Sequence, residues 1–349
     1  MRKKKVSCTV LYNLTGPDEF EQYREIDPAT LPFTPEYPID VNTALEEYEA
    51  VVRALETEGF DVRLHNLEDN WTQFQQLIQS SDPDVIFNMV ELFNGNPQLE
   101  AAITGLFELC GIPYTGSTPF TLALCQRKGL TKHILTNQGI STPHFRILRT
   151  SKVPRRHGLR YPIIVKPTRE DASLGVEPAS VVYDYAQLCE RAAAVFERFK
   201  QPVLVEEFIE GLELHVAILG NDQPEVLPIL EYDFSELPED HPPIITYDVK
   251  WNPLNLAYHQ VHVQCPADLP AAVARKVKKL AILAYQATYC RDYARVDVRL
   301  SKDEKPYVLE VNPNPDLTEG VSFMEAAEKA GLTFQQTLRK IVEFALARG

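Results

Sequence analysis

Two short segments near the C-terminus carry polar residues at a spacing that suits metal or phosphate chemistry. In "ARVDVRL", Arg295 and Asp297 alternate with valines, and in "PYVLEVN" Glu310 and Asn312 are two residues apart. Side chains on a strand alternate between its two faces, so each pair shares a face, with Glu310 and Asn312 ~6–7 Å apart. The intervening "SKDEK" predicts a β-hairpin. Such a hairpin would bring Asp297 close to Glu310 and Asn312.

This set of side chains has the chemistry of a metal site. Two carboxylates and an amide oxygen are hard ligands that suit Mg²⁺ or Mn²⁺, whose remaining ligands are water and substrate phosphates. We therefore predict Asp297, Glu310 and Asn312 as metal ligands. Leu309 and Val311 are expected on the opposite side of the strand, in a core. The alternative is an exposed charged face of the hairpin that binds nothing.

A nucleotide site, if present, must use other means than the common glycine-rich loops. The sequence has neither GxxxxGK[ST] nor GxGxxG. Lys166 ends the apolar segment "YPIIVK", and Lys132 lies on the preceding predicted helix. Either can be a surface lysine whose stem covers apolar neighbours, but two of them upstream of the acidic set favour phosphate contacts. The loop "REDASLGV" can offer backbone N–H groups. Residues 206–209 and Glu213 are candidates for adenine and ribose.

Composition narrows the class of protein. The 349 residues suffice for two or three domains, and a net charge of −14 argues against nucleic acid as a partner. No apolar segment is long enough for a membrane span or a signal-peptide core. Six cysteines without a CxxC pair predict reduced thiols in a cytoplasmic protein. We expect "RKKK" at 2–5 to be a solvated tail, and His259 and His262 of "HQVHV" to be strand residues rather than metal ligands.

The first third of the chain alternates predicted strands and helices. Strands are predicted in "KVSCTVLYNL", "FDVRLHNL" and "DVIFNMVEL", and helices in "NTALEEYEAVVRALETEG", "WTQFQQLIQS" and "LEAAITGLFELCG". The first helix has an N-cap candidate at Asn42 or Thr43, and Gly59 ends it. This order predicts a parallel sheet with right-handed crossovers.

Two polar, proline-rich segments interrupt the regular elements. Residues 17–40 contain five prolines and many acidic residues, and residues 231–260 surround "TYDVKW". Connections of this length are uncommon in compact domains. We expect residues 17–40 to be a lid or a mobile excursion, and residues 231–260 to be a lid.

Six segments together indicate a protein family. Each segment alone is weak evidence, but their order along the chain is specific. They are "IIVKPTREDASLGV", "VLVEEFIEGLELHVAILGN", "TYDVKW", "CPADL", "ARVDVRL" and "YVLEVNPNPDLT". Together they resemble the ATP-grasp superfamily, and within it the D-alanine–D-alanine ligases, over roughly residues 85–345. The resemblance implies an α/β (α+β) chain in which an open parallel-sheet domain precedes an ATP-grasp fold. We expect a Rossmann-like domain at 1–124, a central subdomain at 125–205 and a C-terminal subdomain with the metal and catalytic residues at 206–349.

The resemblance also implies roles for individual residues. Those expected to bind ATP are Lys132, Lys166, Glu206, Phe208, Ile209, Glu213, Lys250 and Trp251. Those expected at the reacting centre are Arg295, Lys250 and Ser173. Asp297, Glu310 and Asn312 match the magnesium ligands. In the lid, Trp251 replaces the tyrosine of the family's Lys-Tyr pair.

The sequence departs from the family where the substrates would bind. The loop after Lys-Pro usually reads Gly-Ser-Ser, but here Ala172 stands in place of the middle serine. Asp316 takes the place of a turn glycine, and the serine position falls on Val321, with Ser322 one residue later. Glu91 lies in "VELFNGNPQLE", which replaces the family's His-Gly and Gly-Glu-Asp-Gly signature. We therefore take Asp316, Ser322 and Glu91 as candidates for substrate contacts.

The resulting expectation is an ATP-dependent carboxylate–amine ligase that works through an acyl phosphate. ATP and Mg²⁺ (or Mn²⁺) are the expected cofactors, and the substrates are a small carboxylate and a small amine other than two D-alanines. Two alternatives remain: a genuine D-alanine–D-alanine ligase with diverged loops, and a nucleotide-binding protein without ligase activity. No nucleic-acid or membrane partner is expected, and the oligomeric state stays open between monomer and homodimer.

Overall fold

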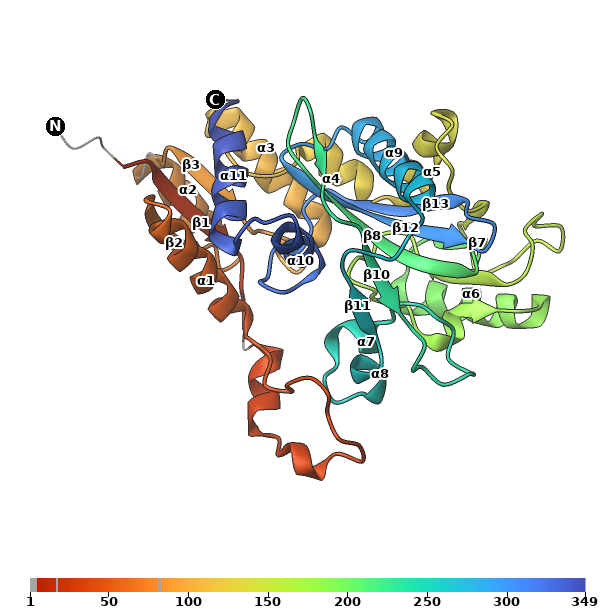
Figure 1. The fold of residues 1–349 in the computed structure, drawn as a ribbon. Helices are drawn as coiled ribbons and strands as arrows, with labels where there is room; N and C mark the ends of the chain where they lie inside the picture. Colours follow the sequence, from red (N-terminus) through yellow and green to blue (C-terminus); the bar gives the residue numbers. More distant parts are fainter. Residues whose placement is uncertain (1–4, 17, 81–82, 349) are drawn as a thin grey trace.

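The N-terminal part of the chain is a parallel sheet flanked by helices (Figure 1). The computed structural model describes residues 5–16, 18–80 and 83–348. The sheet has the order β2-β1-β3, as predicted. Thr43 is the N-cap of the first helix and forms a capping box with Glu46. The elements are β1 (Ser7–Tyr12), α1 (Ala44–Thr57), β2 (Asp61–Asn66), α2 (Trp71–Ser80), β3 (Val85–Asn88) and α3 (Glu100–Cys110).

A second sheet follows and is antiparallel throughout, in the order β4-β7-β5-β6. One face of it packs on α6 through a core that includes Ile163, Leu188 and Val205. Two short helices before it, α4 and α5, lead from the first sheet. The elements are α4 (Pro119–Cys125), α5 (Lys128–Asn137), β4 (Phe145–Leu148), β5 (Ile163–Pro167), β6 (Val181–Val182), α6 (Tyr185–Phe199) and β7 (Val203–Glu207).

The third sheet carries the predicted hairpin. Its order is β11-β10-β8-β12-β13, with β9 on an edge of β8. Val296 and Val298 of β12 are buried against α9, so the alternate residues of β12 face the other side. The elements are β8 (Gly211–Leu219), β9 (Glu225–Val226), β10 (Leu230–Asp233), β11 (His262–Gln264), α9 (Ala271–Ala287), β12 (Tyr293–Ser301) and β13 (Pro306–Asn312).

A β-bulge in β13 corrects one prediction. Asp297 pairs with Glu310 and Val298 pairs with Val308, so Leu309 is an extra residue on this strand. Val308 and Val311 are buried, whereas Leu309 is half-buried and lines a cavity. The expectation that Leu309 faces the core is wrong, because strict alternation stops at the bulge.

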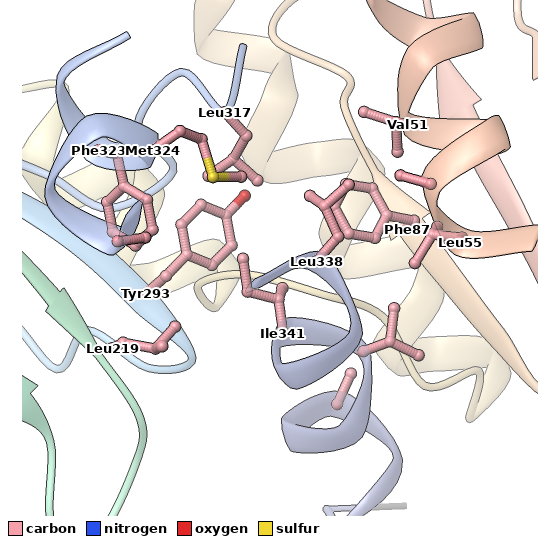
Figure 2. Close-up of a cluster of buried hydrophobic side chains, with 14 of the residues drawn as sticks. Val51, Leu55, Phe87, Leu219, Tyr293, Leu317, Phe323, Met324, Leu338 and Ile341 are labelled. Carbon is pink, nitrogen blue, oxygen red and sulfur yellow. The ribbon is translucent and has the colours of Figure 1, made fainter. Parts of the chain in front are cut away.

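The last two helices return to the first sheet. These are α10 (Ser322–Lys329) and α11 (Phe334–Leu346), and α10 was not predicted. Leu338 and Ile341 of α11 share a core with Val51, Leu55 and Phe87 of the N-terminal domain (Figure 2). The end of the segment expected as the C-terminal subdomain, 206–349, therefore packs with the first sheet.

The two proline-rich segments contain short helices and lie beside each other (Figure 1). Residues 17–40 include the 3-10 helices η1 (Glu19–Glu25) and η2 (Pro28–Thr30), and residues 231–260 include α7 (Tyr247–Trp251) and α8 (Leu256–His259). His259 therefore ends a helix while His262 begins β11, so the strand expected for "HQVHV" is wrong.

Most of "RKKK" lies outside the described residues. No helix in the described ranges is long and apolar enough to cross a membrane.

Gly211→Ala should destabilise the protein more than Gly59→Ala. Both glycines have positive φ, at +143° and +94°, which costs an alanine about 1–2 kcal/mol. A Cβ on Gly211 would lie 2.0 Å from the Leu300 carbonyl oxygen, whereas Gly59 has open space. We expect a loss of about 3 kcal/mol or more for Gly211→Ala in chemical denaturation. Equal losses for the two variants would contradict the close approach of β8 and β12.

Candidate active site

A cavity of about 650 Å³ lies between the second and third sheets. Its volume is typical of sites for small molecules. Its wall is built by β5, β7, β8, β12, β13, α7 and the turn after β13. The predicted residues on the wall are Lys166, Ser173, Glu206, Phe208, Ile209, Glu213, Lys250, Trp251, Arg295, Asp297, Glu310, Asn312, Asp316 and Glu91. Lys132 and Ser322 are the predicted residues that do not line it.

The predicted metal ligands lie together on the floor of the cavity. Arg295 holds both oxygens of Asp297, at 2.7 and 3.0 Å. The Asn312 amide nitrogen donates to Asp297 at 2.9 Å, so its side-chain oxygen is the atom left for a cation. Burial alone would raise the pKa of Glu310, but neighbouring lysines outweigh it and hold the pKa well below its ordinary value. The donors are hard, anionic or neutral oxygens, and this set fits Mg²⁺ or Mn²⁺.

Lys128, which was not among the predicted residues, faces this set from the start of α5. Its Nζ lies 2.9 Å from Glu310 and 3.1 Å from Asp171. Burial favours the neutral amine, but the two carboxylates outweigh it and raise the pKa of Lys128. The lysine is therefore a permanent positive charge on the cavity wall, next to the predicted metal ligands. Its position four residues before Lys132 in "RKGLTK" places both on one side of the helix, which is the signal that could have revealed it.

Lys132 lies behind the wall, which corrects its predicted contact with phosphates. It is 1% exposed, and its Nζ contacts Glu206 at 2.7 Å and donates to Thr142 at 2.8 Å. Lys166 contacts the other oxygen of Glu206, also at 2.7 Å, and reaches the cavity. Burial raises the pKa of Glu206, but the two lysines outweigh it and the net shift is downward. In this geometry Lys132 neutralises Glu206, and Lys128 and Lys166 are the lysines that face a ligand.

The predicted adenine and ribose residues follow β7 and begin β8. Phe208 and Ile209 are half-buried on the wall, and the Arg299 guanidinium lies 5.1 Å from the centre of the Phe208 ring. Arg299 also contacts Glu213 at 2.8 Å. Burial raises the pKa of Glu213 and lowers that of Arg299, and their mutual attraction opposes both shifts. The result is an apolar slot with a polar end, which suits a nucleoside.

The loop after β5 is bonded to the lid segment. The Ser173 hydroxyl donates to the Ile245 carbonyl at 2.9 Å, and the Trp251 indole donates to the Ala172 carbonyl at 2.9 Å. Ser173 thus lines the cavity, but its hydroxyl is bonded to the 231–260 segment in this structure. Lys250 lies over the Trp251 ring, 4.6 Å from its centre. Burial lowers the pKa of Lys250, as does the charge of Arg295.

Two further acidic residues line the cavity. These are Glu91 and Asp316, and Asp316 also accepts a hydrogen bond from the Thr318 amide at 2.9 Å. Desolvation and the charge of Asp316 raise the pKa of Glu91. Burial, with Asp316 and Glu91 as neighbours, raises the pKa of Glu47 to about 7. Burial and Glu91 raise the pKa of Glu100 to about 8. Negative charges therefore raise one another's pKa here, and Lys250 is a positive charge that acts on both Glu91 and Asp316.

His215 of β8 is a second residue that the sequence did not reveal. Its Nε2 lies 3.6 Å from Asp297, and its Nδ1 lies 3.3 Å from the Ser322 hydroxyl. Burial, and then Arg295, outweigh the attraction of Asp297 and lower the pKa of His215 to about 3. The imidazole is therefore neutral. Ser322 also lies 3.5 Å from Arg295, so it meets the site through these two side chains.

Comparisons with known proteins identify the family of this chain. A family profile described as the D-ala D-ala ligase C-terminus matches residues 134–343. A D-alanine–D-alanine ligase of Carboxydothermus hydrogenoformans is 31% identical over 312 residues, covering 87% of this chain and 93% of that protein. The uncharacterized protein y4sG of Sinorhizobium fredii is 33% identical over 305 residues, covering 86% of this chain and 87% of that protein.

Solved structures give the same fold. The D-alanine–D-alanine ligase of Bacillus anthracis complexed with ATP superposes with a TM-score of 0.73, at 24% identity, covering 99% of this chain and 98% of that one. The VanG D-Ala:D-Ser ligase of Enterococcus faecalis gives a TM-score of 0.71 at 21% identity, covering 98% of this chain and 100% of that one. The chain therefore has the ATP-grasp fold and belongs to the D-alanine–D-alanine ligase family of ATP-dependent carboxylate–amine ligases.

Proposed function

We propose that this protein uses ATP and Mg²⁺ (or Mn²⁺) to join a small carboxylate to a small amine, and that the pair is not two D-alanines. The observation that carries this proposal is the lining of one cavity. It combines the predicted metal ligands, Lys128, Lys166 and Arg295 with two further carboxylates, Glu91 and Asp316. The first group is suited to phosphoryl transfer, and the two carboxylates disfavour an anionic acceptor.

In the first step, the substrate carboxylate attacks the γ-phosphorus of ATP, the bond to ADP breaks, and an acyl phosphate forms. Lys128 and Lys166 hold positive charge where the phosphates would lie, and Asp297, Glu310 and Asn312 would hold the metal. The bound metal would neutralise charge on the transferring phosphoryl group. Phe208 and Ile209 would hold the adenine, and Glu213 the ribose hydroxyls.

In the second step, the amine attacks the acyl carbon and phosphate leaves, which completes the amide. Arg295 is placed to stabilise the negative charge that develops on the carbonyl oxygen. Its guanidinium is fixed by the two bonds to Asp297, so the charge is oriented before the substrate arrives. Lys250, over Trp251 in the lid, lies on the wall of the same cavity and would add a second positive charge.

The choice of acceptor rests on Asp316 and its neighbours. D-alanine carries a carboxylate that would approach this turn, and like charges ~4 Å apart cost on the order of 1 kcal/mol in water and more in a drier site. The position of the expected serine is Val321, and Ser322 is turned to His215 and Arg295. Both features favour an acceptor with a cationic or neutral group beside Asp316. Because all six cysteines are free thiols, we place the reaction in the cytoplasm.

A genuine D-alanine–D-alanine ligase is the second candidate function. It is favoured by the names of relatives that are 30–35% identical over most of their lengths. Under this reading Asp316 serves only to cap the turn through the Thr318 amide. The two candidates predict different results with D-alanine.

Incubation with D-alanine, ATP and Mg²⁺ should yield little D-alanyl-D-alanine by mass spectrometry, because Asp316 repels the acceptor carboxylate. The same protein should release ADP with another carboxylate and amine from a screened panel. Asp316→Gly should increase dipeptide formation from D-alanine, while Asp222→Gly, in the β8–β9 turn, serves as the control. Efficient D-alanyl-D-alanine synthesis by the unaltered protein would overturn the proposed choice of substrate.

Lys128→Met should mainly slow ATP turnover, whereas Lys132→Met should mainly lower the stability of the fold. Lys128 faces the cavity, so its loss should slow ATP turnover by ~10²–10³ while the fold remains intact. Loss of Lys132 leaves Glu206 buried with one partner fewer, which should cost about 3–5 kcal/mol of stability. Turnover and chemical denaturation of both variants are the measurements. A stable Lys132→Met protein with impaired turnover, beside an active Lys128→Met protein, would reverse the assignment.

Glu47→Gln should stabilise the protein, and more so as the pH rises. The pKa of Glu47 is about 7 in the folded protein, against an ordinary value of 4.5. From pH 4.5 to 7 the unfolded chain loses this proton before the folded chain does, so native stability falls across that window. The variant avoids this loss, which is at most about 3 kcal/mol. Denaturation at pH 5 and pH 8 tests it, with Glu56→Gln as control, and a difference independent of pH would contradict the raised pKa.

A further inference from the structure

The 18–40 segment makes a defined contact with the lid helices. The Tyr37 amide donates to His259 Nδ1 at 3.1 Å, and the Tyr37 hydroxyl lies 2.6 Å from His262 Nδ1. The Phe33 ring lies 5.2 Å from that of His259. Figure 1 shows the N-terminal excursion reaching down to α7 and α8. Residues more than two hundred positions apart in the chain are thus bonded, and we name this contact the clasp.

His259 gives the clasp its specificity. Its side chain is 2% exposed, and both ring nitrogens are bonded: Nδ1 accepts from Tyr37 and Nε2 donates to the Pro253 carbonyl at 2.8 Å. A neutral imidazole satisfies both partners at once. If the segment moved away, the buried Nδ1 would need another donor, and leaving such a group without one is costly. The clasp is therefore a specific contact, in which the buried polar groups are paired.

The other end of the segment is rooted beside the cavity. Asp18 accepts from the amides of Ala44 and Phe20, at 2.6 and 2.9 Å. Phe20 lines the cavity, and its ring lies 6.3 Å from that of Trp251. Trp251 is in turn bonded to Ala172 of the loop after β5. Three separate segments therefore meet at one edge of the cavity: the excursion, the lid and the loop.

The excursion contributes little to any core. Most of its side chains between 21 and 38 are exposed, and Ile39 is its one fully buried apolar residue in the described range. Segments with few buried contacts open at low free energy, independently of the rest of the fold. Its buried contacts are concentrated at the two ends, on α1 and on α8. This distribution is typical of a segment that closes over a site, and not of a segment that stabilises the fold.

We propose that residues 18–40 form the second half of the gate over the reaction cavity, and that Phe20 is its substrate-facing positioning residue. The inference rests on the proposed ligase function for its chemical consequence. With the gate open, water adds to the acyl carbon of the acyl phosphate, the bond to the phosphate oxygen breaks, and carboxylate, phosphate and a proton are released. ATP is then consumed without amide formation. The closed gate excludes that water and leaves the amine as the attacking group.

Trp251 reports on closure of the segment, because its ring lies 6.3 Å from that of Phe20 at the end of the segment away from the clasp. The protein has two tryptophans, so Trp71→Phe leaves Trp251 as the single fluorophore. In that background we compare Tyr37→Ala, which breaks the clasp, with Thr34→Ala at an exposed position of the same segment. Acrylamide quenching of Trp251 is measured with and without Mg²⁺ and a non-hydrolysable ATP analogue. Tyr37→Ala should raise the quenching constant at least twofold, and Thr34→Ala should leave it unchanged.

Hydrogen exchange separates the gate from a general loss of structure. In Tyr37→Ala, exchange should rise in residues 18–40 and 256–259 together and stay unchanged in β12 and β13. Unchanged quenching and exchange in Tyr37→Ala would overturn the gate, whatever the protein catalyses. The expected quenching and exchange in a protein without ATP turnover would support the gate and refute the ligase instead.

Phe20→Ala tests the positioning role. This change keeps Tyr37 and His259 in contact but removes the aromatic wall. With a substrate pair found by the panel screen, phosphate release should exceed amide formation by at least twofold, while exchange at 256–259 stays as in the unaltered protein. A phosphate-to-amide ratio of one in this variant would overturn the role assigned to Phe20.

Discussion

The pairing of β12 with β13 is the constraint on which the site depends. The bulge at Leu309 lets Val308 and Val311 both enter the core while Glu310 and Asn312 remain opposite Asp297 and Arg295. Without that extra residue, strict alternation could not satisfy the core and the cavity together. The predicted metal ligands, Arg295 and the buried packing of α9 thus share one strand register.

Positive and negative groups of the cavity neutralise one another in this structure. Lys128 binds Glu310, Arg295 binds Asp297, Arg299 binds Glu213, and Lys166 binds Glu206. Buried charges are costly unless they are paired, so the pairs keep the site folded before any ligand arrives. Under the proposed function, a phosphate or a metal would exchange one partner for another and would not have to desolvate a bare charge.

The sequence predicted most elements because their periodicity is local, as in the parallel strands, the hairpin and the capped helix at Thr43. It also predicted the shared face of Arg295 and Asp297. It predicted Lys132 and missed Lys128, which lies on the same side of the helix, because the difference between them depends on where Glu206 lies in another strand. His215 was missed since a lone histidine in an apolar strand carries no pattern, and the clasp joins segments whose distance in the chain hides their contact.

The position of α11 has a consequence for how the chain is made. The apolar surface of β3 and α1 around Phe87, Val51 and Leu55 is covered by Leu338 and Ile341. During synthesis from the N-terminus, that surface is complete only after the last helix has left the ribosome. The N-terminal sheet is thus enclosed only after the two sheets that follow it in the chain have been synthesised.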